Sequence, residues 1–210
     1  AGVNAFPIVA LISFLIGLIM AFQAAIPMKQ FGAEIFVADL IALSTLRELG
    51  PLMTAIVMAG RTSSAFAAEL GTMKVNEEVD ALTTMGLDPV RFLVLTRVIA
   101  TLFMMPLITI FANLFGILGG SVVLLSMGYP LNTYIDRIIQ SADYVDLLGG
   151  LLKSLAFGLI VAGIGCSHGL RTRTGASAVG DSTTKAVVSG IIMIILTDGL
   201  FSVVYFYLGI

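Results

Sequence analysis

Residues 74–89 read KVNEEVDALTTMGLDP, a short acidic stretch between two long apolar segments. It is too short and too charged to cross a bilayer. Its apolar residues recur at steps of four, three and three, which places them on one stripe of a helix. These residues are Val75, Val79, Leu82 and Met85. The polar positions include Glu77, Glu78, Asp80 and Thr84. The pattern predicts an amphipathic helix outside the membrane.

Start and stop signals bound this helix. Asn76 is a suitable N-cap, and acidic residues in a first turn suit the helix dipole. Gly86 can end the helix, and Asp88-Pro89 prevents its continuation. One interpretation is a helix lying in the lipid head groups, but such helices usually have a basic polar face, and the cytoplasmic leaflet is itself anionic. We favour a helix that docks on a protein, with its carboxylates outward and its apolar stripe on the chain's own helices.

The composition is that of an integral membrane protein, with 58% hydrophobic residues, 11% charged residues and a mean hydropathy of +1.06. A net charge of -2 gives no support to nucleic-acid binding, which calls for a clustered basic face. The single cysteine excludes an internal disulfide, and the single histidine leaves little for a metal cluster of the usual ligand types.

About five apolar stretches are long enough to cross a bilayer, because a helix rises about 1.5 Å per residue and the hydrocarbon core is about 30 Å thick. They are residues 5–28, 35–70, 92–127, 147–170 and 186–210. Gly50-Pro51 interrupts the second, which we expect to kink or restart there. We therefore predict an all-α polytopic membrane protein with a single domain over residues 1–210 and one short helix outside the membrane.

The distribution of Lys and Arg predicts the orientation, since positive charge near the ends of spans is retained in the cytoplasm. Seven of the eleven basic residues are expected on one side: Arg61, Lys74, Arg91, Arg97, Arg171, Arg173 and Lys185. This places the acidic helix in the cytoplasm, together with residues 171–185, which we interpret as a loop. Ile210 is expected on the far side.

Two opposite charges, Arg47 and Glu48, interrupt an apolar segment just before Gly50-Pro51. Each ionised side chain near a bilayer centre costs about 2.5 to 3.5 kcal/mol on insertion scales, so both should face a partner or a wet cavity. Adjacent residues diverge by about 100° on a helix, so each should meet another helix or chain. They either pair with neighbouring helices or line the polar neck of a lipid cavity. Asp198, deep in the last span, is expected to hydrogen-bond a helix partner rather than to relay protons.

Two runs resemble the MlaE family of permeases, the membrane subunits of MCE-type ABC transporters that move phospholipids between the inner and outer membranes of Gram-negative envelopes. They are residues 48–100, ELGPLMTAIVMAGRTSSAFAAELGTMKVNEEVDALTTMGLDPVRFLVLTRVIA, and residues 175–188, GASAVGDSTTKAVV. The resemblance extends over essentially the whole chain. It implies a multi-pass inner-membrane homodimer, and the family's extra N-terminal interfacial segment is expected to be missing here.

The resemblance also implies site residues. In ABC importers a cytoplasmic coupling helix docks on the ATPase, and the matching positions here are Glu77, Glu78, Asp80, Ala81, Leu82, Met85 and Gly86. The family's lipid pocket lies at the dimer interface, near Arg47, Glu48 and Leu49, with Gly50 and Pro51 as a hinge. The first span would supply its facing wall through Gln23, Phe22, Met20, Ile19 and Ile16.

The chain contains no G-x-x-x-x-G-K-[ST] phosphate loop, so ATP hydrolysis is expected in a partner ATPase that holds ATP and Mg. The other implied partners are phospholipid, a second copy of the chain, a periplasmic ring of MCE-domain protein and a small STAS-type cytoplasmic subunit. The alternative function is an ion-coupled secondary transporter that uses Arg47, Glu48 and Asp198 as its coupling site.

Overall fold

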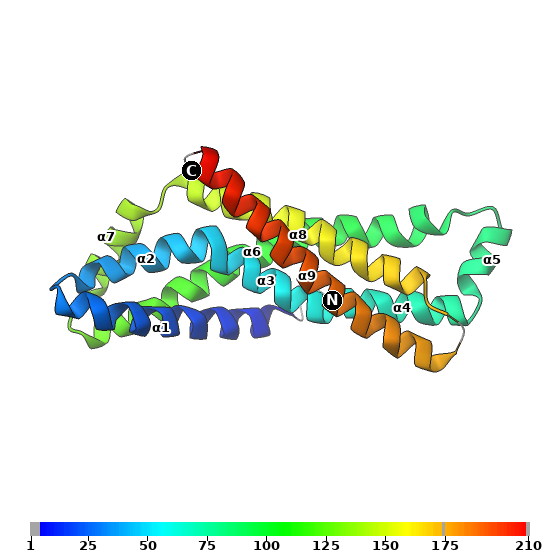
Figure 1. Cartoon of the computed structure of the whole chain (residues 1–210), viewed down its shortest axis with the longest axis horizontal. Helices are drawn as coiled ribbons and strands as arrows, with labels where there is room; N and C mark the ends of the chain where they lie inside the picture. The colour runs from blue at the N-terminus through cyan, green and yellow to red at the C-terminus, as the bar shows by residue number, and fades with distance from the viewer. Residues whose placement is uncertain (1–4, 174, 209–210) are drawn as a thin grey trace.

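The computed structural model describes residues 5–173 and 175–208, which form helices and connecting turns without a strand. Five helical stretches are long and apolar enough to cross a membrane: Phe6–Gln30, Glu34–Val75, Val90–Ser126, Tyr144–Leu170 and Ser177–Leu208. The prediction of an all-α protein with five spans is confirmed. The helices form an elongated bundle with α5 at one end and α7 at the other (Figure 1).

The first span is α1, Phe6–Gln30. The second is one helical run built from short pieces: η2 (Glu34–Phe36), α2 (Val37–Ser44), η3 (Thr45–Leu49), α3 (Gly50–Met58), η4 (Ala59–Ser63) and α4 (Ser64–Val75). Of the two predicted alternatives at Gly50-Pro51, a restart is wrong, because η3 is a π-helical turn that carries the chain into α3 without a break, and a kink stays a prediction. A proline cannot donate to the carbonyl four residues back, and the extra residue of a π turn accommodates this.

The rest of the chain comprises α5 (Glu78–Thr84), η5 (Val90–Val94), α6 (Leu95–Ser126), α7 (Leu131–Ser141), α8 (Tyr144–Leu170) and α9 (Ala176–Leu208). The interpretation of residues 171–185 as a loop is largely wrong, since α9 begins at Ala176. Its polar first turns are stabilised along the helix, by the Asp181–Lys185 pair at 2.7 Å and by the Thr183 hydroxyl, which donates to the Gly180 carbonyl. The amphipathic helix α7 was not predicted.

Glycines set the closest helix contacts. Gly17 of α1 lies against the backbone of Gly116 in α6, and Gly119 lies against the carbonyl of Phe14. A side chain at these glycines would collide with the facing backbone, so only glycine allows α1 and α6 to approach this closely. Gly165 of α8 meets Ser63 in the same way. The bundle is therefore held by close backbone packing along its length.

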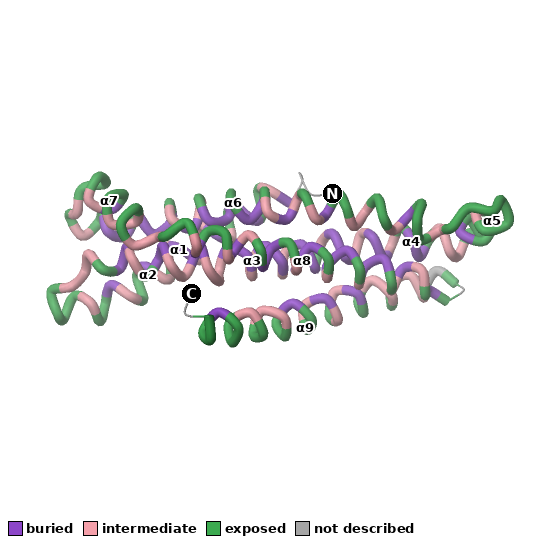
Figure 2. Tube along the Cα trace, turned by 90° about the horizontal axis from the view of Figure 1, so that it is seen from above, coloured by how far each residue is buried: buried purple, intermediate pink, exposed green. Residues whose placement is uncertain are grey.

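The buried residues follow the axis of the bundle, and α9 is the least buried span (Figure 2). In α9 only 11% of the most apolar window is buried, against 33% to 44% in the other four spans. The α5 end also holds the turn between α8 and α9, and the α7 end holds the turn between α1 and α2 (Figure 1). This division matches the two sides expected from the sequence, although Ile210 lies outside the described residues.

Candidate functional site

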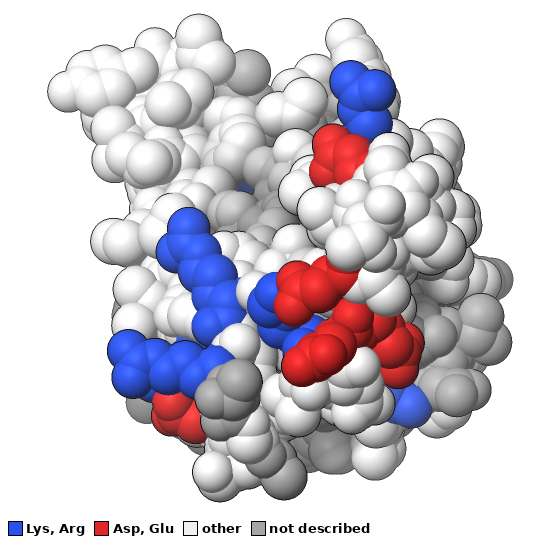
Figure 3. Space-filling model, turned by 90° about the vertical axis from the view of Figure 1, so that its right-hand side faces the viewer, with Lys and Arg blue, Asp and Glu red and all other residues white. Residues whose placement is uncertain are grey.

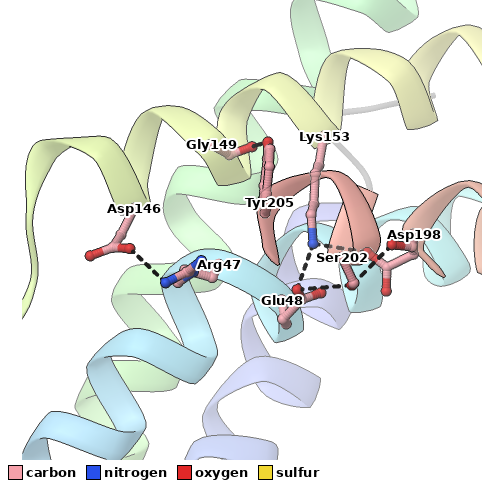
Figure 4. Close-up of polar contacts among 8 residues, drawn as sticks. All are labelled: Arg47, Glu48, Asp146, Gly149, Lys153, Asp198, Ser202 and Tyr205. Atoms are coloured by element: carbon pink, nitrogen blue, oxygen red, sulfur yellow. Dashed lines mark hydrogen bonds and ion pairs between the residues drawn. The ribbon is translucent and has the colours of Figure 1, made fainter. Parts of the chain in front are cut away.

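Arg47 and Glu48 lie in the η3 turn, and their side chains reach different partners on α8 (Figure 4). A guanidinium nitrogen of Arg47 lies 3.4 Å from a carboxylate oxygen of Asp146, in the first turn of α8. A carboxylate oxygen of Glu48 lies 2.7 Å from Lys153 Nζ, further along α8. The prediction that these two neighbours meet another helix rather than each other is confirmed.

Lys153 is the centre of this site. Its side chain is 0% exposed, and its ammonium lies between Glu48 of η3 and Asp198 of α9, which is 3.2 Å away. It also lies 5.3 Å from the ring centroid of Tyr205, close enough for a cation–π contact. A buried ammonium without partners is strongly destabilising, so the two carboxylates and the ring are what allow Lys153 to sit here.

Asp198 and its neighbours on α9 complete the contacts with η3 and α8. The Ser202 hydroxyl lies 3.3 Å from a Glu48 carboxylate oxygen and 3.0 Å from the Asp198 carbonyl. The Tyr205 hydroxyl donates to the Gly149 carbonyl at 2.9 Å. Asp198 therefore pairs with a helix partner, as expected, and that partner is Lys153. Three segments far apart in the sequence meet at this point.

We define the charge cluster as Arg47, Glu48, Asp146, Lys153 and Asp198. It contains two cations and three carboxylates, so its ions cannot all be neutralised in pairs. Lys153 is the fully buried member of the cluster, whereas the side chains of Arg47 and Glu48 are 31% and 38% exposed. A rim that carries both signs of charge can contact the phosphate and the amine of a zwitterionic group.

Of the five predicted residues of α1, the described lining of the cleft beside Leu49 includes Ile16 alone. Ile16 and Leu49 line one narrow cleft between α1, the η3–α3 region and α6. The space inside is about 10 Å³, enough for about one water molecule. The other four predicted residues of α1 are not among the described lining of the cleft: Ile19, Met20, Phe22 and Gln23. Ile19 and Phe22 are half exposed, and Gln23 is exposed.

Gly50 and Pro51, the predicted hinge, are both buried. A side chain at Gly50 would collide with the side-chain oxygen of Asn113 in α6, so glycine is needed for the contact between α3 and α6. Pro51 stands in the first turn of α3, beside the α8 glycine Gly150. The structure thus gives both residues a packing role, and a hinge motion here stays a prediction.

The α5 helix presents the two faces that its sequence predicts. Val79 is buried and Leu82 packs beside it, in a cluster that includes Phe66 and Leu70 of α4. The predicted ATPase-facing positions are exposed: Glu77, Glu78, Asp80, Ala81, Met85 and Gly86. Lys74 Nζ lies 2.6 Å from an Asp80 carboxylate oxygen and ties α5 to the end of α4. The side of α5 away from the bundle is therefore acidic and accessible.

The limits of α5 differ from the predicted ones at its start. Asn76 is not its N-cap, because α4 extends through Val75 and Asn76 ends it. The reversal is made by Glu77, which has φ of 61° in the left-handed region. Few residues other than glycine adopt this conformation, so the residue types around Glu77 did not indicate it. The predicted end is confirmed, since Gly86 has φ of 79° and its N–H bonds to the Thr83 carbonyl.

Four polar residues of the site were not predicted as members: Lys153, Asp146, Ser202 and Tyr205. A lone lysine inside the apolar run LLGGLLKSLAFG was the available signal for the first, because a charge at that depth needs a partner. The hydroxyl groups of Ser202 and Tyr205 carried no such signal. Within residues 5–173 and 175–208, no group of three His, Cys, Asp or Glu side chains is placed to hold a metal.

Comparison with known proteins identifies the family. The family described as Permease MlaE matches residues 1–204. The chain belongs to the MlaE permease family. It is accordingly a multi-pass permease of an ABC transporter, and this argues against the alternative of an ion-coupled secondary transporter.

Individual relatives of this MlaE-family permease cover nearly the whole chain. A probable ABC transporter permease protein of Rickettsia typhi is 36% identical over 98% of this chain and 80% of its own length. The intermembrane phospholipid transport system permease protein MlaE of Haemophilus influenzae is 31% identical over 99% of this chain and 80% of its own length. The chloroplastic protein TRIGALACTOSYLDIACYLGLYCEROL 1 of Arabidopsis thaliana is 37% identical over 93% of this chain and 56% of its own length.

Proposed function

We propose that this chain is the inner-membrane subunit of an ABC transporter that moves phospholipids between two membranes, with its α5 end in the cytoplasm. The observation that carries this proposal is the packing of α5, whose apolar side is fixed on the bundle while its carboxylates face outward. The name of the Haemophilus influenzae relative supports phospholipid as the substrate. The excess of Lys and Arg at the α5 end supports the orientation.

In this proposal a partner ATPase, which holds ATP and Mg, contacts Glu77, Glu78 and the exposed face of α5. Movement of α5 is transmitted to α4 through the Lys74–Asp80 pair and through the packing of Val79 and Leu82. From there, Glu34–Val75 is one helical run that leads directly to Glu48. The π turns η4 and η3 are the compliant points of this run, because π turns interrupt the regular hydrogen-bond ladder of a helix.

The lipid head group is proposed to bind the exposed rim of the charge cluster, with its phosphate at Arg47 and its amine, where it has one, at Glu48. The cleft beside Leu49 holds about 10 Å³, so the acyl chains need further walls. A second copy of the chain supplies them in this proposal, which agrees with the poorly covered face of α9. Ile16, Ile19, Met20, Phe22 and Gln23 then face the lipid across the dimer.

Each of the remaining partners is assigned to one end of the helix bundle. The periplasmic ring of MCE-domain protein is proposed to sit on the α7 end, and the ATPase with its small STAS-type subunit on the α5 end. The α7 helix suits the boundary between membrane and ring, since Leu131, Ile135 and Ile139 form an exposed apolar stripe at steps of four residues.

The test is ATP-driven transfer of a fluorescent phospholipid by the assembled complex in proteoliposomes. Glu78→Lys reverses one carboxylate on α5, and Asp136→Lys makes the same change on an exposed residue of α7, at the opposite end of the bundle. We expect Glu78→Lys to lower the transfer rate by about tenfold or more and to reduce copurification of the ATPase, because it places like charges at a docking contact. Asp136→Lys should leave copurification of the ATPase as in the wild type, and equal copurification by the two variants would contradict the proposed coupling.

A further inference from the structure

A basic pocket lies at the α5 end, where α8 turns into α9, and its role is not explained by the proposed transport function. Its volume is about 270 Å³. It is lined by His168, Arg171, Arg173, Ala178, Asp181, Ser182 and Lys185. Figure 3 looks onto this end of the molecule, where basic side chains lie at the left beside one acidic group and most of the acidic side chains lie nearer the centre and right, with basic groups among them.

The walls of the pocket are fixed by hydrogen bonds. Thr172 follows the last turn of α8 and is buried, and its hydroxyl lies 3.2 Å from the His168 carbonyl and 3.0 Å from the Ser182 hydroxyl. These contacts join the end of α8 to the second turn of α9. Gly71 of α4 packs against the Thr172 side chain from behind. The spacing between the α8 side and the α9 side of the pocket is therefore set by the bundle.

The pocket carries excess positive charge. Lys185 Nζ lies 2.7 Å from an Asp181 carboxylate oxygen, so these two ions largely neutralise each other. Among the described parts of the chain, neither Arg171 nor Arg173 forms an ion pair with a carboxylate. The positive end of the α9 dipole also begins here, at Ala176. Two unpaired guanidinium groups beside a helix N-terminus favour a bound anion.

The level of the pocket along α8 and α9 indicates which kind of anion it binds. On α8, His168 follows the apolar run GLIVAGIGC, and on α9, Lys185 is followed directly by the apolar run AVVSGIIMIIL. The pocket thus lies at the level where both helices become apolar. In a membrane this level is occupied by lipid head groups, and basic pockets between spans are sites for anionic phospholipids.

We propose that the pocket between α8 and α9 binds the phosphate of an anionic phospholipid from the leaflet at the α5 end. The bound lipid is separate from the transported one, since the Arg47–Asp146 pair lies at the opposite end of α8. The guanidinium groups of Arg171 and Arg173 donate hydrogen bonds to the phosphate, and Lys185 and His168 lie beside it. Free phosphate shares this chemistry, but the position of the pocket beside both apolar runs favours a lipid.

The test measures the dissociation constant of fluorescent phosphatidylglycerol for the full-length protein in detergent micelles, with fluorescent phosphatidylcholine as the neutral comparison. The pocket variant is Arg171→Gln/Arg173→Gln. The matched control is Lys29→Gln/Arg91→Gln, which removes the same charge from exposed residues outside the pocket. Arg171→Lys/Arg173→Lys retains the charge, and Arg173→Gln alone serves if the double variant does not fold.

We expect phosphatidylglycerol to bind more tightly than phosphatidylcholine, and the pocket variant to weaken its binding about 20-fold, since each basic group near a membrane surface contributes about fivefold. The control should bind as the wild type does, and the lysine variant should retain most of the affinity. Equal weakening by the pocket variant and the control, or equal affinity for the two lipids, would overturn the proposal. Competition by inorganic phosphate at low millimolar concentration would support the phosphate site but assign it to a soluble ligand.

Discussion

The charge cluster and the α5 segment both carry several carboxylates, but the carboxylates of the two regions differ in whether they pair with cations. In the cluster, Asp146, Asp198 and Glu48 each pair with a cation from another helix. On α5, Glu77 and Glu78 are exposed and form no ion pair within the described residues. Burial makes an unpaired ion costly, so buried charges are satisfied internally. Exposed charges are under no such constraint and remain available to a partner.

Removal of the buried cation should have the largest effect on stability. Lys153→Met leaves Glu48 and Asp198 without their shared ammonium, and we expect it to lower the free energy of unfolding by about 3 to 5 kcal/mol. Thermal unfolding of the purified protein in detergent measures this loss. Combining Lys153→Met with Glu48→Gln and Asp198→Asn should restore much of the stability, because the buried ammonium and both of its carboxylate partners are then replaced by neutral side chains. A single variant as stable as the wild type would show that Lys153 is not the centre of the cluster.

The second prediction tests the contact that brings α8 to η3. Gly150 of α8 lies against the Leu46 carbonyl, with no room for a side chain. Gly150→Ala should lower the free energy of unfolding by about 1 to 3 kcal/mol through overpacking. Gly163 of the same helix has open space around it, so Gly163→Ala is the matched control and should be neutral or stabilising by up to about 1 kcal/mol. Thermal unfolding distinguishes the two, and equal effects would argue against the close contact.

A smaller effect is expected where α5 joins α4. Asp80→Asn removes the ion pair with Lys74, whose side chains are 59% and 33% exposed. Exposed pairs of this kind contribute about 0.2 to 1 kcal/mol, and the contribution should shrink as salt is added. Thermal unfolding at low and high ionic strength measures it. A loss that does not depend on salt would indicate that Asp80 acts through something other than this pair.

The smallest effect on stability is expected on the outer face of α5. Glu78→Lys should change the free energy of unfolding by no more than about 0.5 kcal/mol, because its side chain is exposed and pairs with no cation in the described chain. Thermal unfolding of Glu78→Lys and of Lys153→Met, each compared with the wild type, measures the two changes in the free energy of unfolding. A destabilisation comparable to that of Lys153→Met would mean that the carboxylates of α5 stabilise the fold rather than remain available for contact with a partner protein.

The sequence predicted those features that depend on long or repeated patterns. The five spans follow from apolar length, the outward carboxylates of α5 from its stripe of Val79 and Leu82, and the divergence of Arg47 and Glu48 from helical geometry. The resemblance to the MlaE family, carried by residues 48–100 and 175–188, predicted the family that the comparisons show.

The features that were missed depend on contacts between distant segments or on local backbone detail. Lys153 could be recognised as a charge in need of a partner, but only the fold brings it to Glu48 and Asp198. The π turn η3 and the left-handed Glu77 are set by packing around Pro51 and by the reversal between α4 and α5. The first turns of α9 were misread because their polar composition resembles that of a loop.

In the proposed mechanism, movement of α5 reaches the lipid site through the continuous helical run Glu34–Val75. The deciding measurement is photo-crosslinking of phospholipid to a photoreactive residue at position 49, in the assembled complex, with and without ATP and vanadate. We expect a lipid adduct whose yield changes when nucleotide is bound, and no such change in Glu77→Lys/Glu78→Lys. An adduct yield that does not change when nucleotide binds would contradict this mechanism. So would a nucleotide-dependent change that persists in Glu77→Lys/Glu78→Lys.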